Sequence, residues 1–174
     1  MIIILGMAGA GKSTQCRKLE QSGDFKWFSV GQKLREIEQG AERAEMAQGK
    51  GLQDTIVTPI VREELNRLGD SPEVLLDGCP RTVSQARWLA AGLDTPKVRL
   101  VLHLVVDDDI AMERLLKRQR EDDTEEAMRV RFNGYHRDIP LVLAEFGQRQ
   151  IEIVTINASL TEEEVFKQIE KSLM

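Results

Sequence analysis

The chain has 174 residues, a length that suits one sizeable domain. Its hydrophobic content is 41% and its charged content 30%, which is ordinary for a soluble globular protein, and no apolar run approaches the ~20 residues that span a bilayer. The formal net charge of −5 argues against nucleic acid as a partner, because an acidic chain is repelled by a phosphate backbone. The two cysteines, Cys16 and Cys79, lie far apart in sequence, so we expect a cytoplasmic protein without a structural zinc site.

Apolar runs typical of strands alternate with longer helical stretches along the whole chain. The five runs cover residues 1–5, 25–29, 74–76, 98–106 and 151–156. Their continuous rather than alternating apolar character indicates strands buried on both faces, as in a parallel sheet. We therefore predict an α/β fold with a five-stranded parallel sheet and helices on both of its faces.

Helix boundaries can be read at several points. Residues 31–68 are long, helical in pattern and free of strand signals, so part of this stretch is predicted to form a small inserted subdomain. Thr161 with Glu164 forms a capping box for the last helix, and Asp123 with Glu126 suggests another helix start.

A glycine-rich phosphate-binding motif follows the first strand. Residues 6–13 read G-M-A-G-A-G-K-S and fit G-x-x-x-x-G-K-[ST] in full. Its glycines let successive backbone N–H groups point inward around a phosphate, and the next helix adds its positive N-terminus. Lys12 is expected to reach the β- and γ-phosphates, and the Ser13 hydroxyl to bind Mg²⁺. The motif indicates ATP or another nucleotide as ligand, but it does not separate a kinase from a GTPase or an ATPase.

A second motif, L-L-D-G-C-P-R-T-V-S-Q, covers residues 75–85. Asp77 ends a buried strand, where an acid lies beside the phosphate loop and can hold Mg²⁺, in part through water. The alternative is an Asp that caps the next helix. Arg81 follows four residues later and would face the same cleft.

With these residues in place, the chain resembles the adenylate kinase family of nucleoside monophosphate kinases from residue 1 to about residue 173. Three anchors carry the resemblance: G-M-A-G-A-G-K-S-T-Q, L-L-D-G-C-P-R-T-V-S-Q and R-E-D-D-T-E-E-A-M-R-V-R. The resemblance implies a P-loop NTPase-type core that transfers the γ-phosphoryl group of ATP, with Mg²⁺, to a nucleoside monophosphate, most readily AMP. It also implies a monophosphate-binding subdomain at about residues 29–58 and a vestigial lid at about residues 118–122.

The resemblance assigns site residues position by position. It places the catalytic side chains at Lys12, Arg81, Arg118, Arg120 and Arg131. It places the ATP contacts at Gly9, Ala10, Gly11, Lys12, Ser13, Thr14, Arg114 and Arg118. It places the acceptor contacts at Val30, Arg35, Leu52, Gly78, Arg81, Gln85, Arg120 and Arg131, with Ser13 and Asp77 at the metal. Arginine suits this chemistry because its fork binds phosphate oxygens in two places and stays charged.

The lid is the main departure from the family pattern. Only Gln119 separates Arg118 from Arg120, where short-lid members of the family carry a small loop. Two residues of extended chain span at most roughly 7 Å, so a hinged flap cannot be built here. Poor water exclusion over the donor phosphates is the expected consequence.

Gln85 is the candidate reader of the acceptor base. It lies four residues after Arg81, about one helical turn away, so both side chains can face one pocket. An amide offers a donor and an acceptor side by side, which matches the edge of adenine. Other possibilities are a kinase for CMP, UMP or a non-nucleotide acceptor, and a weakly active nucleotide-binding accessory protein. We expect small-molecule nucleotides as partners, no nucleic acid, no membrane, and a monomer.

Overall fold

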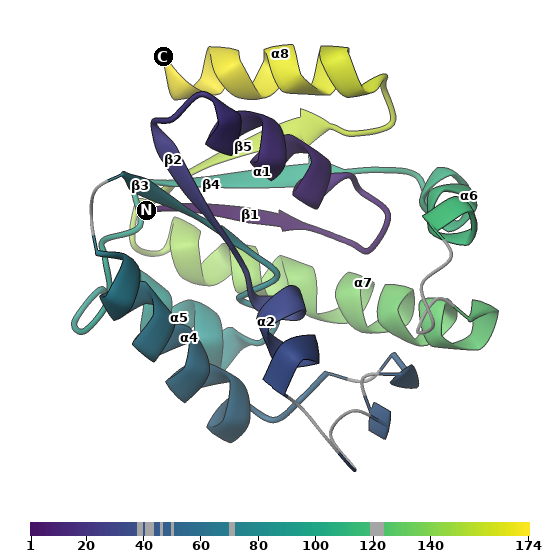
Figure 1. The fold of residues 1–174 in the computed structure, drawn as a ribbon, viewed down its shortest axis with the longest axis horizontal. Helices are drawn as coiled ribbons and strands as arrows, with labels where there is room; N and C mark the ends of the chain where they lie inside the picture. The colour runs from purple at the N-terminus through teal and green to yellow at the C-terminus, as the bar shows by residue number, and fades with distance from the viewer. Residues whose placement is uncertain (38–39, 41–43, 46, 50, 70–71, 119–123) are drawn as a thin grey trace.

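The computed structural model describes residues 1–174 except 38–39, 41–43, 46, 50, 70–71 and 119–123 (Figure 1). In these residues five strands alternate with helices. The strands are β1 (Ile2–Gly6), β2 (Phe25–Ser29), β3 (Glu73–Asp77), β4 (Leu100–Val105) and β5 (Glu152–Asn157). The helices are α1 (Lys12–Gln21), α2 (Val30–Ile37), α4 (Asp54–Leu68), α5 (Val83–Ala91), α6 (Asp108–Arg118), α7 (Glu125–Gly147) and α8 (Glu162–Leu173).

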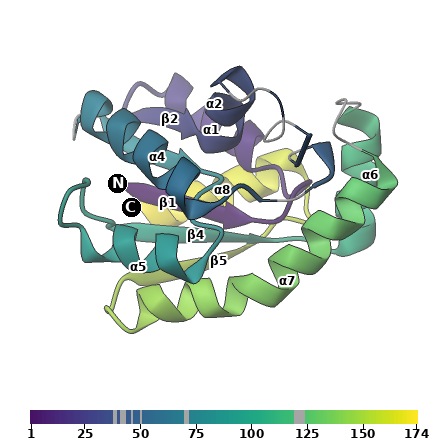
Figure 2. The same cartoon turned by 90° about the horizontal axis from the view of Figure 1, so that it is seen from below.

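The five strands form one parallel sheet in the order β2-β3-β1-β4-β5. Helices α1 and α8 cover one face, and α4, α5 and α7 cover the other (Figures 1 and 2). The predicted fold class and all five predicted strands are confirmed, with boundaries that differ by one or two residues.

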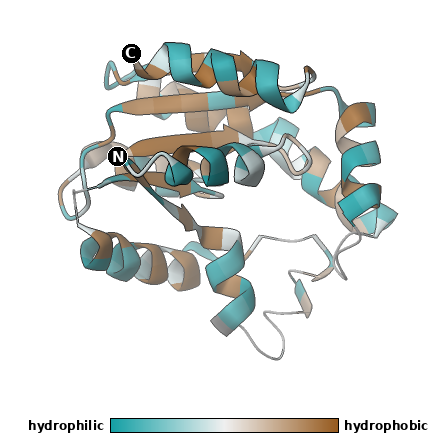
Figure 3. Ribbon diagram, turned by 45° about the horizontal axis from the view of Figure 1, so that its top comes forward, coloured by the Kyte–Doolittle hydropathy of each residue, from teal (hydrophilic) through white to brown (hydrophobic). Residues whose placement is uncertain are grey.

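Two clusters of buried hydrophobic residues hold the helices against the two faces of the sheet. Figure 3 shows the sheet strands mostly in brown, the colour of hydrophobic residues, with helices that carry teal hydrophilic residues around them. Ile2 and Ile4 of β1 belong to a cluster with residues of α1, α6 and α8, whereas Ile3 and Leu5 belong to a cluster with residues of α4 and α5. Successive side chains of a strand point to opposite faces, so an unbroken apolar run serves both layers.

Of the two helix starts predicted from capping residues, the one at α8 is confirmed and the one at α7 differs by one residue. The capping box of Thr161 and Glu164 is present in full at the start of α8. For α7 the prediction was wrong by one residue: Thr124 is the N-cap and its side chain accepts a hydrogen bond from the Ala127 N–H, while Asp123 lies outside the described residues. Thr and Asp are both good N-caps, so adjacent candidates are hard to separate by sequence.

Parallel strands bring their carboxyl ends to one edge of the sheet. Gly6 pairs with Leu104, Ser29 with Asp77, and Val105 with Asn157. The chain leaves the sheet at this edge through the phosphate loop, α2 and the loop after Asp77. Ligands of open α/β sheets bind outside this edge, so we expect the functional site there.

Candidate active site

The phosphate loop connects β1 to α1 at the carboxyl edge of the sheet. Gly11 is the N-cap of α1 with a φ of 84°, and Gly9 has a φ of 86°. A Cβ on Gly9 would lie 2.5 Å from the Ala111 carbonyl oxygen of α6, so the loop passes α6 too closely for any side chain. The loop therefore presents its backbone, and the N-terminus of α1 follows directly with amide groups suited to phosphate oxygens.

Lys12 is folded back over this loop. Its Nζ donates hydrogen bonds to the carbonyl oxygens of Gly6 at 2.7 Å and Met7 at 2.9 Å. Burial lowers the pKa of the Lys12 ammonium below its usual value, while the Asp77 carboxylate acts in the opposite direction. The guanidinium groups of Arg81 and Arg118 lower this pKa further, so both charges lie near enough to Lys12 to act on it. Asp77, Arg81 and Arg118 therefore all act electrostatically on Lys12.

Asp77 lies at the end of β3 and is almost fully buried. Its Oδ2 accepts a 3.0 Å hydrogen bond from the Ser13 hydroxyl. Thr82, not Asp77, caps α5, so the alternative that Asp77 is a helix cap is excluded. A hydroxyl and a carboxylate side by side at the mouth of a phosphate loop are the oxygen donors that Mg²⁺ takes, so Ser13 and Asp77 fit the ion that the sequence implies.

A cavity of about 610 Å³ lies over the phosphate loop, and we call it the loop cavity. Its walls come from the loop, α1, α6 and the segment after β5, and they include the predicted ATP contacts. The lining residues with that prediction are Gly9, Ala10, Gly11, Lys12, Ser13, Thr14, Arg114 and Arg118.

Arg114 closes one side of the loop cavity. Its Nη1 donates to the Ala158 carbonyl oxygen at 2.7 Å and its Nη2 to the Leu160 carbonyl oxygen at 3.2 Å. These bonds join α6 to the segment that follows β5. Arg114 therefore holds a wall of the cavity in place, in addition to lining it.

Several of the predicted acceptor contacts lie together at the start of α2. A Cβ on Gly31 would lie 3.6 Å from Nη1 of Arg35 and 3.9 Å from Nη2 of Arg81, so the two guanidinium groups converge on the start of α2. Arg81 also donates from Nε to the Gly78 carbonyl oxygen at 3.1 Å. Val30 and Leu52 are buried in one apolar cluster. A Cβ on Gly78 would lie 3.8 Å from Cβ of Val30 and 3.9 Å from Nη2 of Arg81, so Val30 brings this cluster close to the arginine. The cluster offers an apolar wall beside an arginine pair.

Gln85 is held by a hydrogen-bond network that the sequence did not indicate. Its Oε1 accepts from the Arg81 backbone N–H at 2.7 Å, and its Nε2 donates to Asp54 Oδ1 at 2.7 Å. Asp54 Oδ2 accepts from the Thr82 hydroxyl at 2.8 Å, and the same Thr82 oxygen accepts from the Gln85 N–H. The sequence analysis did not identify Asp54. Its one signal in the sequence is its position at the end of G-K-G-L-Q-D, residues 49–54, directly before a helical pattern.

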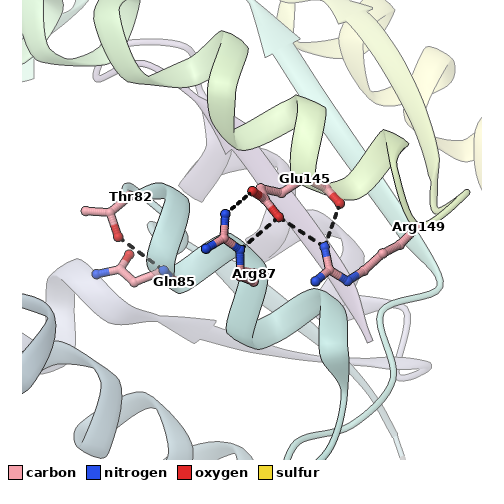
Figure 4. A network of polar contacts seen from close by, with 5 residues as sticks. All are labelled: Thr82, Gln85, Arg87, Glu145 and Arg149. Atoms are coloured by element: carbon pink, nitrogen blue, oxygen red, sulfur yellow. Dashed lines mark hydrogen bonds and ion pairs between the residues drawn. The ribbon is translucent and has the colours of Figure 1, made fainter.

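The helix that carries Gln85 is anchored to α7 at its next turns (Figure 4). Glu145 of α7 accepts from Arg87 at 2.7 Å and from Arg149 at 3.1 Å. Hydrogen bonds from these two arginines keep the pKa of the Glu145 carboxyl below its usual value. The pair of Arg87 and Glu145 therefore joins α5, whose first turn carries Gln85, to α7.

Gln15 is a second residue that the sequence analysis missed. It lines the loop cavity, is almost fully buried, and donates from Nε2 to the Glu162 carbonyl oxygen at 3.0 Å. The bond joins α1 to the start of α8. The one hint in the sequence is that Gln15 is a polar residue at a position of α1 that faces the protein interior.

Arg131 is the last of the predicted site residues that the structure describes. Arg131 is half-buried in the second turn of α7. Arg120 lies outside the described residues, as do residues 119–122 of the predicted lid. The described chain resumes at Thr124, the N-cap of α7.

Comparison with known proteins places this site in a family. A family model described as adenylate kinase matches residues 4–151. A protein named adenylate kinase from Parasynechococcus marenigrum is 34% identical over 180 residues, which cover 99% of this chain and 97% of that protein. Adenylate kinase 1 of Nostoc is 33% identical with the same coverage. Adenylate kinase isoenzyme 5 of Homo sapiens is 33% identical over 181 residues, which cover 97% of this chain and 32% of the human protein. With this agreement along nearly its whole length, the chain belongs to the adenylate kinase family.

Proposed function

We propose that the protein catalyses ATP + AMP = 2 ADP. The observation that carries the proposal is that Lys12 lines the loop cavity and also feels the charge of Arg81, whose guanidinium group converges with that of Arg35 at the start of α2. A donor phosphate in the loop cavity and an acceptor phosphate beside the arginine pair meet at this lysine. Membership of the adenylate kinase family supports the same reaction.

In the proposed reaction an oxygen of the AMP phosphate forms a bond to the γ-phosphorus of ATP, and the bond to the β–γ bridging oxygen breaks. Negative charge spreads over the equatorial oxygens of the moving group, so catalysis depends on positioning and on fixed positive charge. Lys12 and the loop N–H groups would hold the donor phosphates, Arg81 and Arg35 the acceptor phosphate, and Arg118 the moving group. Arg120 and Arg131 are proposed for that last role as well.

Mg²⁺ at Ser13 and Asp77 would neutralise charge on the β- and γ-phosphates when bound. The Asp77 carboxylate would hold the ion partly through water, and the Ser13 hydroxyl would exchange its bond to Asp77 for one to the ion. Nucleotide oxygens and water would complete the coordination of the ion.

The acceptor is proposed to be AMP because of Gln85. Its amide can pair with the edge of adenine, whereas guanine presents the reverse polarity and uracil lacks the amine. Val30 and Leu52 would contact the base or ribose, and Gly78 would leave room for the acceptor next to Asp77. A panel of AMP, CMP, UMP and GMP with ATP as donor tests the proposal. AMP is expected to give the highest kcat/KM, and a lead for CMP or UMP would contradict it.

The subdomain boundaries remain part of the proposal. Residues 29–58 would form the monophosphate-binding insertion, and residues 118–122 would stand in place of a lid. In the described part of the chain no helix is long and apolar enough to cross a membrane. We propose a cytoplasmic monomer, which suits the two free, buried thiols Cys16 and Cys79.

A further inference from the structure

Asp54 begins α4 and reaches across to the start of α5. Its two carboxylate oxygens accept from Gln85 Nε2 at 2.7 Å and from the Thr82 hydroxyl at 2.8 Å. The contact joins residues 31 positions apart and ties the acceptor-side insertion to the helix that carries Gln85. Gln85 is 3% exposed, so its amide cannot reorient through solvent.

The chemistry of the two partners fixes which way the Gln85 amide faces. An ionised carboxylate only accepts hydrogen bonds, and a backbone N–H only donates them. The amide nitrogen must therefore face Asp54, and the amide oxygen must face the Arg81 N–H. A flipped amide would set oxygen against carboxylate and nitrogen against N–H, which loses both bonds and leaves buried groups unpaired.

The network leaves part of the amide available to a ligand. A primary amide has two N–H groups and two oxygen lone pairs. Asp54 accepts a hydrogen bond from one N–H of Gln85, and the Arg81 backbone N–H donates to one lone pair of its oxygen. The Cys79 thiol is a weak donor to the same oxygen at 3.5 Å. The pKa of that thiol is raised to about 12 by burial, so it stays protonated and cannot act as a competing anion. One N–H and one weakly engaged oxygen lone pair of Gln85 remain for a ligand, and the locked amide fixes which side donates and which side accepts.

We propose that Asp54 is a positioning residue that selects 6-amino over 6-oxo purine acceptors by locking the Gln85 amide in one orientation. The proposal rests on the function proposed above. Adenine pairs with the locked amide through its ring nitrogen and exocyclic amine. Hypoxanthine carries the opposite donor and acceptor order at the same two positions, and it pairs only with a flipped amide.

The test compares AMP with IMP, which differ only in the polarity of that edge. In the parent, kcat/KM for AMP is expected to exceed that for IMP. In Asp54→Ala the ratio of AMP to IMP is expected to fall roughly tenfold or more, the scale of one buried polar mismatch. Equilibrium binding of AMP and IMP by calorimetry reports the same ratio without turnover, and ATP affinity should stay the same.

A double-mutant cycle separates positioning from general damage. With Gln85→Leu already present, Asp54→Ala should leave the AMP to IMP ratio unchanged, because no amide remains to orient. Glu125→Ala is the matched control, since it removes a first-turn helix carboxylate that pairs only with Arg129 in the described residues. This control should keep the parent ratio.

A second variant keeps the proposal testable if Asp54→Ala does not fold. Asp54→Asn has the same shape but can also donate, so a flipped Gln85 finds one partner, and the ratio should fall by a smaller factor. An unchanged ratio in a folded Asp54 variant, or an equal fall in the Gln85→Leu background, would overturn the positioning role. Absence of ADP formation from AMP in the parent would instead contradict the proposed function, so the two failures are distinguishable.

Discussion

The Ser13 hydroxyl and the Asp77 carboxylate are hydrogen-bonded at 3.0 Å although 64 positions separate them in the chain. They meet because β1 and β3 are adjacent parallel strands, with Ile4 opposite Asp77, and both strands end at the same edge. Lys12 lies next to this pair. Its pKa is set by burial in one direction and by Asp77 in the other.

Lys12→Ala is expected to lower kcat by at least ~10²-fold, the scale of removing one preorganised electrostatic donor. The loop backbone should survive, because Lys12 contacts it only through two side-chain hydrogen bonds. Steady-state ADP formation measures the effect, and excess EDTA should abolish activity in the parent. Full activity of the variant, or full activity of the parent in EDTA, would contradict the proposed mechanism.

ATP affinity is expected to fall at alkaline pH, and Asp77→Asn should move that fall to lower pH. The pKa of Lys12 is already below its usual value, and Asp77 raises it, so removing the carboxylate lowers it further. Bound phosphate favours the ammonium, so above this pKa binding must take up a proton and weakens as pH rises. Titrations in Mg²⁺-free buffer isolate the charge from metal binding. A midpoint that moves to higher pH in Asp77→Asn would contradict the argument.

Arg81→Ala and Arg114→Ala are expected to act on opposite substrates. Arg81→Ala should raise the KM for AMP or lower kcat with little change in ATP affinity. Loss of a charged hydrogen bond of ~1.5–3 kcal/mol corresponds to roughly ten- to two-hundred-fold. Arg114→Ala removes two bonds to the segment after β5 and should weaken ATP binding instead. Calorimetry with AMP and with ATP measures both effects. Loss of ATP binding in Arg81→Ala with AMP binding intact would show that the donor and acceptor sides were assigned wrongly.

Hydrolysis of ATP without acceptor should be measurable, because in the sequence only Gln119 separates Arg118 from Arg120, which is too little chain for a flap over the donor phosphates. Inserting a short Gly/Ser loop between Arg118 and Arg120 should change the ratio of hydrolysis to transfer. Phosphate release in the absence of AMP is the measurement. A rate below detection in the parent would mean that another segment covers the site.

Gly49→Ala should disturb acceptor binding more than Gly40→Ala. Both glycines have positive φ, 77° and 65°, so both substitutions carry the backbone cost of about 1–2 kcal/mol. A Cβ on Gly49 would also collide with the Ala127 carbonyl of α7, whereas one on Gly40 has nothing within 4 Å. We expect a higher KM for AMP in Gly49→Ala only. Equal KM values in the two variants would show that the contact with α7 plays no part in acceptor binding.

The sequence by itself determined the strands, the phosphate loop and the place of Asp77. These features depend on residues close together in the chain: apolar runs, glycine spacing and an acid at a strand end. The capping box at Thr161 is equally local, and the one-residue error at Thr124 came from two good caps standing side by side.

Only the tertiary structure decided the partners of these elements. The strand order, the contact of Gly49 with Ala127 and the bond between Asp54 and Gln85 all join segments that are distant in the chain. A single residue type does not reveal such pairings, because an Asp at a helix start is explained equally well by the helix dipole alone. Packing of α4 against α5 turned that ordinary first-turn acid into the partner that orients Gln85.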